Sequence, residues 1–259
     1  MVKKGIFITD THWQQDVPLH ASYLAVKSFA KYFKPDIVVH GGDLGEWEFL
    51  MSINERKLQL ISGKTYIKEY DLINRELDFW KSLPKEKPYI LLGNHDERVY
   101  KAIEKNPMLE GSMEWENQVD LKGTHFARWR QPDQPVRIGI PYFAHGWYTV
   151  KYHANKHLES FSGNIIYGHV HKFQQASKIL HAQNQEIQAW SIGCLRDRNP
   201  DWIAGPNEWQ NGFALFYLNG KKSFNVYPIN IINGTFVTPW GELWDYRKIY
   251  KYALRGDRR

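Results

Sequence analysis

The tetrapeptide Gly93-Asn94-His95-Asp96 directly follows the apolar run from Tyr89 to Leu92. A short apolar run that ends in glycine and polar residues predicts a buried strand followed by a loop. A match to Gly-Asn-His-Asp is expected only about 0.002 times by chance in a chain of this composition. This strand end therefore indicates both the type of fold and the type of chemistry.

Two further strands are predicted upstream, each followed by a helix. The runs from Gly5 to Thr9 and from Asp36 to His40 are short, apolar and bounded by polar residues. The segments from Leu19 to Phe33 and from Tyr66 to Trp80 repeat apolar residues every three or four positions, which is typical of one helical face. The order strand, helix, strand, helix, strand predicts a mostly parallel sheet with right-handed crossovers.

The second half of the chain is predicted to be rich in strands and partly antiparallel. Its strand candidates are His125 to Trp129, Arg137 to Phe143, Asn164 to Tyr167, Glu186 to Ile192, Gly212 to Leu218 and Ser223 to Ile229. Asn219-Gly220 between the last two predicts a hairpin turn. We expect a main domain over residues 1–232 and a basic, aromatic C-terminal extension over residues 233–259. The stretch from Trp244 onward is compatible with a docked helix or with a tail.

The composition is that of a globular, soluble protein. The 259 residues are 42% hydrophobic and 24% charged, which is too apolar for a disordered chain. The longest apolar runs are too short to span a bilayer, so we expect no membrane association. The N-terminal apolar stretch stops at Asp10 and does not resemble a secretory signal, and the single cysteine, Cys194, excludes an internal disulfide. We therefore expect a cytoplasmic location.

Metal-binding side chains follow five of the predicted strands. These clusters are Asp10-Thr11-His12, Gly42-Asp43, Gly93-Asn94-His95-Asp96, His145-Gly146 and Gly168-His169-Val170-His171. The carboxyl ends of parallel strands meet at one edge of a sheet, where α/β proteins bind ligands. Aspartate, asparagine and neutral imidazole are suitable ligands for Mn, Fe, Zn or Ni. Six or seven such ligands are too many for one tetrahedral ion and fit two adjacent ions better.

The spacing within the clusters also carries information. In extended backbone, residues two apart point to the same side, so Asp10 with His12, and His169 with His171, are each expected to face a shared cavity. The glycine before several of these ligands is expected to remove side-chain bulk where the chain turns sharply.

The order of these clusters resembles the calcineurin-like metallophosphoesterase family, whose pattern is Asp-x-His, Gly-Asp, Gly-Asn-His-Asp/Glu, His and Gly-His-x-His. The match extends from Ile6 to about Leu195. The resemblance implies an α/β fold, a four-layer α/β/β/α sandwich of mixed sheets with a two-metal centre at the sheet edge. The family's Gly-Ser after the last motif is Gly193-Cys194 here, so this chain lacks the hydroxyl at that position.

The resemblance also implies a role for each polar residue. The implied metal ligands are Asp10, His12 and His171 for one ion, Asn94, His145 and His169 for the other, and Asp43 as the bridge. His95 is implied as the catalytic residue that stabilises or protonates the leaving oxygen. The cofactors are expected to be two divalent ions, Mn²⁺ before Fe, Zn or Ni. The implied reaction is the attack of a metal-bridging hydroxide on a phosphate mono- or diester.

Several residues near the motifs permit two interpretations. Arg98 could contact a substrate phosphate or be a solvated helix residue. Asp96 could orient His95 or cap a loop. His40 and Cys194 are interpreted as buried packing residues. The tryptophans outside predicted elements are interpreted as core and rim side chains in preference to platforms for nucleobases. They are Trp47, Trp115, Trp129, Trp147, Trp202 and Trp209.

Two alternatives to a small-substrate phosphoesterase follow from the same residues. A nuclease acting on DNA or RNA is mildly supported by the basic, aromatic segment from Tyr246 to Arg259, whereas the net charge of +6 fits an anionic substrate and does not by itself indicate nucleic acid. A catalytically silent scaffold is less favoured, because all the implied ligands and His95 are present. The protein phosphatase branch continues as Gly-Asp-x-x-Asp-Arg-Gly, whereas this chain reads Gly42-Asp43-Leu44-Gly45-Glu46-Trp47. The oligomeric state is not predicted by these patterns.

Overall fold

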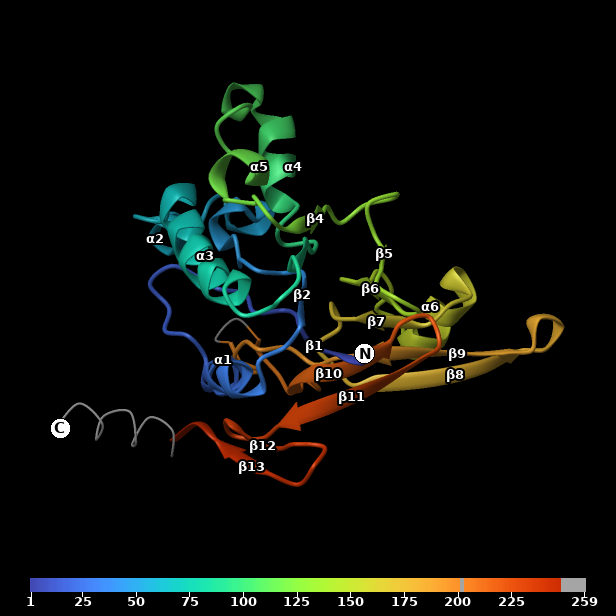
Figure 1. Cartoon of the computed structure of the whole chain (residues 1–259). Helices are drawn as coiled ribbons and strands as arrows, with labels where there is room; N and C mark the ends of the chain where they lie inside the picture. Colours follow the sequence, from blue (N-terminus) through green and yellow to red (C-terminus); the bar gives the residue numbers. More distant parts are fainter. Residues whose placement is uncertain (201–202, 248–259) are drawn as a thin grey trace.

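Two β-sheets and a small ribbon organise the chain, which is seen here in a computed structural model that describes residues 1–200 and 203–247 (Figure 1). The strands of the first sheet are, in spatial order, β11 (Ser223–Ile231), β10 (Asn211–Asn219), β1 (Lys3–Ile8), β2 (Ile37–Gly41), β3 (Tyr89–Leu91) and β4 (His125–Ala127). The strands of the second sheet are β5 (Val136–Arg137), β6 (Tyr142–Ala144), β7 (Ile165–Tyr167), β9 (Gln185–Ser191) and β8 (Gln174–Leu180). The ribbon pairs β12 (Thr235–Val237) with β13 (Leu243–Asp245).

Helices join the strands and cover the sheets. They are α1 (Ala21–Phe33), α2 (Leu58–Ile61), α3 (Tyr66–Lys81), α4 (Arg98–Lys105), α5 (Trp115–Gln118) and α6 (His153–Phe161). β1 to β4 are parallel, as the alternation of strands and helices predicts, and β10 pairs antiparallel with both β1 and β11. In the described residues, every helix is too short or too polar to cross a membrane.

Strand alternation divides the core into three apolar clusters. On β1, Ile6 and Ile8 belong to the cluster that contains the buried faces of α1 and α3, whereas Phe7 belongs to the cluster between the two sheets. On β7, Ile166 packs into that same inter-sheet cluster, and Ile165 packs with α6. Successive strand residues point to opposite faces, so each sheet is covered on both sides. The predicted four-layer α/β/β/α sandwich is confirmed.

The predicted hairpin at Asn219-Gly220 is also present. β10 and β11 pair along their whole length up to Asn219 and Ser223, and Gly220 in the turn has φ of 58°. The strand predicted over residues 137–143 is wrong, because the segment splits into β5 and β6. Gly139 has φ of 71°, and the Ile138 N–H donates to the Pro141 carbonyl at 3.0 Å, which closes a turn inside the apolar run.

The β12–β13 ribbon packs against α1, near the red end of the described chain in Figure 1. The Trp244 indole N–H lies 3.0 Å from the Ser28 hydroxyl oxygen, and Phe236 contacts Phe29 with ring centroids 5.3 Å apart. The ribbon therefore contributes side chains to the core of the sandwich. The domain division at residue 232 stays a prediction, and the helix or tail predicted toward Arg259 lies, from residue 248 onward, outside the described residues.

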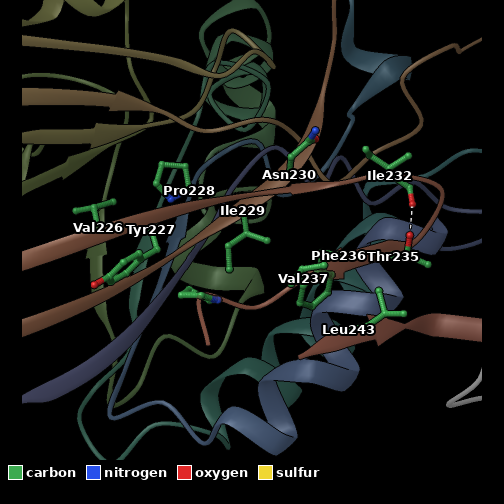
Figure 2. Close-up of a pocket in the computed structure, with 11 residues that line it drawn as sticks. Val226, Tyr227, Pro228, Ile229, Asn230, Ile232, Thr235, Phe236, Val237 and Leu243 are labelled. Atoms are coloured by element: carbon green, nitrogen blue, oxygen red, sulfur yellow. Dashed lines mark hydrogen bonds between the residues drawn. The ribbon is translucent and has the colours of Figure 1, made fainter. Parts of the chain in front are cut away.

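A cavity of about 530 Å³ lies between β11 and this ribbon. Figure 2 shows its mainly apolar walls, which include Ile229 and Leu243, and the turn where the Thr235 hydroxyl donates to the Ile232 carbonyl at 2.6 Å. The residues that line it lie outside all five predicted metal-binding clusters.

Two histidines of α6 are buried in neutral form against β7. His153 Nδ1 lies 2.7 Å from the Tyr167 hydroxyl oxygen, and His157 accepts from the Trp147 backbone N–H at 3.2 Å. The other ring nitrogen of His157 donates to the His153 carbonyl at 2.7 Å. Burial lowers the pKa of both imidazoles to about 4, with Lys172 adding to the effect at His153. Protonation would therefore break the bond from Trp147.

Acidification from pH 7 to pH 5 should consequently destabilise the fold. Both histidines titrate near 6.5 in an unfolded chain, so below that pH the unfolded state binds protons that the folded state excludes. Their contribution is complete above pH 6.5 and is lost as the pH falls toward 4, by about 2 kcal/mol for each histidine at pH 5. Urea unfolding at several pH values would measure this loss of stability. The variant His157→Gln lacks one of the two titrating imidazoles and should lose less stability on acidification. An unchanged pH dependence in that variant would contradict the assignment.

Candidate metal centre

The predicted metal-binding residues meet at the edge where β1, β2, β3, β6 and β7 end. Five of them and His95 line one small cavity of about 160 Å³ together with Arg196 and Trp209. These six are His12, Asp43, Asn94, His95, His169 and His171. Asp10 and His145 lie directly behind this lining and are fully buried. The structure thus gathers all seven predicted ligands and His95 from five loops and from both sheets.

Three residues form the first half of the site. Nε2 of His171 lies 3.2 Å from Oδ1 of Asp10 and 3.2 Å from Nε2 of His12. The potential ligand atoms of Asp10, His12 and His171 all lie within 4.8 Å of one another. This is the trio that the family resemblance assigns to one ion.

The second half of the site surrounds His145. Its Nε2 lies 3.0 Å from the side-chain oxygen of Asn94 and 3.2 Å from Nδ1 of His169. Its Nδ1 faces the Gly41 carbonyl oxygen at 2.9 Å. That carbonyl accepts the Nδ1 proton, so Nε2 is the nitrogen that faces the cavity.

Asp43 lies between the two halves. Its Oδ2 is 3.7 Å from Nε2 of His12 and 3.4 Å from Nε2 of His145. Imidazole nitrogens and carboxylate oxygens that converge at these distances are ligands that suit divalent transition metals. The donor set therefore suits one ion on each side of Asp43.

The charges of the site favour cations. Burial opposes ionisation of Asp43, but the surrounding His145 and His95 outweigh it and hold its pKa well below the usual range. Burial likewise opposes ionisation of Asp10, and His171 outweighs it to lower its pKa to about 2. For His169, burial lowers the pKa to about 4, so its ring is neutral and carries a free lone pair. Burial opposes protonation of His145, but Asp43 outweighs it and raises the pKa of that imidazole to about 9, so the two buried carboxylates already attract positive charge in the metal-free protein.

The backbone of the ligand loops is strained. Five ligand residues that are not glycine have left-handed backbone, with φ of 52° at Asp10, 43° at His12, 50° at Asp43, 72° at His169 and 59° at His171. The expectation that Asp10 and His12, and His169 and His171, converge from extended backbone is therefore wrong. They converge because consecutive tight turns aim both side chains inward. Such conformations are uncommon for residues with a Cβ and are concentrated at functional sites.

Two glycines give the ligands the space that the sequence predicts. A Cβ on Gly93 would lie 2.1 Å from Oδ1 of Asp43, and a Cβ on Gly168 would lie 2.3 Å from Oδ2 of Asp10. Both distances are far below van der Waals contact. The glycines therefore let the backbone of one loop pass directly behind the carboxylate of another.

His95 and Arg98 form a pair at the cavity. The His95 backbone N–H donates to Oδ1 of Asp43 at 2.8 Å, and Nε2 of the ring lies 3.0 Å from a terminal nitrogen of Arg98. Arg98 also donates to the Glu46 carbonyl at 2.6 Å. These contacts direct the Arg98 guanidinium toward the site, and its binding of a substrate phosphate stays a prediction.

Asp96 connects loops. Its carboxylate accepts from the backbone N–H groups of Leu44, Gly45 and Gly93 at 2.9–3.1 Å, and it is fully buried. These bonds tie the loop after β2 to the loop after β3. Of the two interpretations of Asp96, the loop cap is the one that agrees with these hydrogen bonds.

Two residues of the site, Glu46 and Arg196, were not predicted from the sequence, and Trp209 was predicted only as a core or rim side chain. Oε2 of Glu46 lies 2.6 Å from Nδ1 of His12 and 2.7 Å from a terminal nitrogen of Arg196. Trp209 packs edge-on against His171 with ring centroids 4.3 Å apart. The spacing of Glu46 three residues after Asp43 was the available signal for the first. Arg196 and Trp209 follow the last motif and belong to no recognisable pattern.

The residues interpreted as packing groups are buried. His40 bonds to the Thr11 hydroxyl at 3.1 Å, and burial raises the pKa of the Cys194 thiol to about 12. Trp47 and Trp115 are core residues, whereas Trp129 lies beside the site, with its ring centroid 5.9 Å from that of His169. Trp202 lies outside the described residues.

Comparison with known families agrees with this geometry. A family model described as calcineurin-like phosphoesterase matches residues 4–173, well over half of the sequence. The chain belongs to the calcineurin-like phosphoesterase family. Members of this family bind divalent metals and act on phosphate esters. In this chain, histidines and aspartates of the predicted clusters form groups that could hold a metal ion. No curated protein matches the sequence significantly.

Comparison with solved structures finds similar chains at low sequence identity. Vps29 from Entamoeba histolytica, crystallised with Zn²⁺, is 12% identical, with a TM-score of 0.49 over 94% of this chain and 99% of that chain. GAP50, described as the anchor in the inner membrane complex of Plasmodium, is 11% identical, with a TM-score of 0.37 over 93% of this chain and 86% of that chain.

Proposed function

We propose that this calcineurin-like phosphoesterase is an active, binuclear metalloenzyme that hydrolyses phosphate mono- or diesters in the cytoplasm. The observation that carries the proposal is the position of Asp43, whose Oδ2 lies within 3.7 Å of His12 Nε2 and 3.4 Å of His145 Nε2. A carboxylate between two sets of nitrogen ligands is the arrangement that a bridged pair of ions needs. The single cysteine fits a reducing compartment.

The proposed ligand set follows the two halves of the site. It comprises Asp10, His12 and His171 on one side, Asn94, His145 and His169 on the other, and Asp43 between them. Mn²⁺ is the proposed ion, with Fe, Zn or Ni as alternatives, because these donors bind all four. When bound, such a pair of cations supplies hydroxide near neutral pH and neutralises negative charge on phosphate oxygens.

The protein's own contribution to catalysis lies in His95 and Arg98. Burial lowers the pKa of His95 to about 3, so its ring is neutral in the metal-free protein. The adjacent Arg98 guanidinium, 3.0 Å from His95 Nε2, supplies a permanent positive charge. We propose that His95 contacts the leaving oxygen and that Arg98 binds the substrate phosphate and stabilises the developing charge.

A nuclease is the second candidate function. Trp209 and Trp129 are partly exposed and flank the two halves of the site, next to His171 and His169 respectively. Indole rings at these positions could stack nucleobases on either side of the phosphate. Binding of DNA or RNA should weaken steeply as salt rises, whereas hydrolysis of a small ester should respond little.

Metal removal provides the direct test of the proposal. The purified protein should contain about two transition metal ions per chain and hydrolyse p-nitrophenyl phosphate or bis-p-nitrophenyl phosphate. Chelation should abolish hydrolysis of both esters, and Mn²⁺ should restore it. Elemental analysis and a substrate panel that includes nucleotides and single- and double-stranded DNA would measure these expectations. A fully metal-loaded protein that hydrolyses none of them would favour the scaffold.

A further inference from the structure

We propose that Gln134 is a positioning residue that holds ligand His145 against the loop of Asn94, and this inference rests on the proposed function. Gln134 lies in the segment between β4 and β5, outside every predicted metal-binding cluster, and is fully buried. Its side-chain amide joins the backbone of one ligand loop to the end of the strand before the other. The two loops follow strands of different sheets.

The amide of Gln134 uses both of its polar atoms. Oε1 accepts from the backbone N–H of His145 at 2.8 Å, directly after β6 of the second sheet. Nε2 donates to the carbonyl of Leu92 at 2.7 Å, directly after β3 of the first sheet, and lies 3.4 Å from the carbonyl of Ala127. An amide carries an acceptor and a donor on one planar group, whereas a carboxylate only accepts and a thioether is a weak acceptor. Glutamate or methionine here would keep the size but lose at least one of these bonds.

The two ligands that this bridge connects meet inside the site. Nε2 of His145 lies 3.0 Å from the side-chain oxygen of Asn94, which is two residues after Leu92. Because Asn94 follows β3 and His145 follows β6, their separation depends on how the two sheets are held together at this edge. Metal ligands must be held within about 0.5 Å of the binding geometry. The bonds of Gln134 to both loops supply that constraint.

Other side chains hold the rest of the loop after β6. The chain leaves the second sheet there, so its backbone groups need other partners. The Trp129 indole N–H donates to the Gly146 carbonyl at 2.8 Å, and His157 accepts from the Trp147 backbone N–H at 3.2 Å. The contact from Gln134 reaches a ligand residue itself and extends to the end of β3. Loss of Gln134 should therefore affect the relation between the ligands more than the fold of the loop.

The first measurement reads the hydrogen bond in the metal-free protein. Amide hydrogen exchange at His145 should be slow in the wild type and about 10-fold faster in Gln134→Met, which removes the amide oxygen at similar volume. Gln175→Met is the matched control, because it removes an exposed amide on β8 and should leave exchange at His145 unchanged. Exchange at His145 that is as fast in the wild type as in Gln134→Met would overturn the proposal.

The second measurement reads metal binding. Titration with Mn²⁺ should show that Gln134→Met weakens one of two sites by about 10–100-fold and leaves the other nearly unchanged. Val26→Ala is the control for a general loss of stability, because Val26 is buried in the core on α1 and should leave both affinities unchanged. Equal weakening of both sites by Gln134→Met, or no weakening at all, would refute the positioning role.

Gln134→Glu keeps the test decisive if Gln134→Met does not fold. The carboxylate retains the acceptor for His145 and loses the donor to Leu92, so exchange at His145 should stay slow while one metal affinity still falls. Two sites of wild-type affinity in this variant would refute the bridge. A wild type that binds metal but exchanges freely at His145 would refute this inference alone. A wild type with slow exchange at His145 that binds no metal would refute the proposed function instead.

Discussion

Replacement of Asp43 by asparagine should lower phosphoesterase activity by about 10³-fold or more and should abolish binding of two metal ions per chain. The reason is the position of Oδ2 between His12 and His145, at 3.7 and 3.4 Å from their Nε2 atoms. Asparagine has nearly the same shape, but its neutral oxygen is a weak ligand and its amide nitrogen cannot bind a cation. In the proposed centre, this substitution would therefore weaken both the binding of the two ions and the electrostatic stabilisation of a bound phosphate.

The measurement combines steady-state kinetics with elemental analysis of the purified variant. Asp78→Asn is a suitable control, because that carboxylate lies on α3 with a side chain 70% exposed. It should retain activity and metal content within about twofold, since surface substitutions rarely exceed 0.5 kcal/mol. Retention of both metals and of full activity by Asp43→Asn would exclude the bridging role.

Gly93→Ala should also inactivate the protein, through the backbone. An added Cβ would lie 2.1 Å from Oδ1 and 2.5 Å from the backbone nitrogen of Asp43, so the loop after β3 must move away from the loop after β2. We expect destabilisation of about 1–3 kcal/mol. We also expect a loss of metal binding comparable to that of Asp43→Asn, because a displacement of 1 Å at such a site costs about 10²-fold or more.

Thermal unfolding with and without Mn²⁺ would measure both effects. Gly205→Ala is the matched control, since a Cβ there meets open space and should change neither stability nor metal content. If Gly93→Ala bound two ions with wild-type affinity, the close approach of the two loops would not be required for the site.

The sequence predicted best those features that depend on local patterns. The buried parallel strands ending in Gly42-Asp43 and Gly93-Asn94 were found because apolar runs of this length end in recognisable polar residues. The strand β8 was not predicted, because it lies at the edge of its sheet and is largely exposed. Its apolar residues, within residues 174–180, do not alternate regularly with polar ones. Helix α6 was missed for a related reason, since it is short and its buried face contains two histidines in place of aliphatic residues.

For the candidate site, residue identity was predictable and geometry was not. Motif order pointed to the residues that the structure gathers, from Asp10 to His171. Left-handed backbone stays uncommon even at histidine and aspartate, where it is enriched, so the turns that aim these side chains were not foreseen. The contact of Glu46 with Arg196 joins residues 150 positions apart and depends on the packing of two sheets, which local patterns do not encode.

The left-handed backbone of the predicted ligand residues implies a trade-off between thermal stability and metal binding. Each residue with a Cβ in this conformation costs the native state about 1–3 kcal/mol. Glycine at His12, His169 or His171 is expected to relieve that cost and make the protein more resistant to heat, while removing a predicted metal ligand. Thermal robustness and the proposed metal centre therefore place opposite demands on these positions.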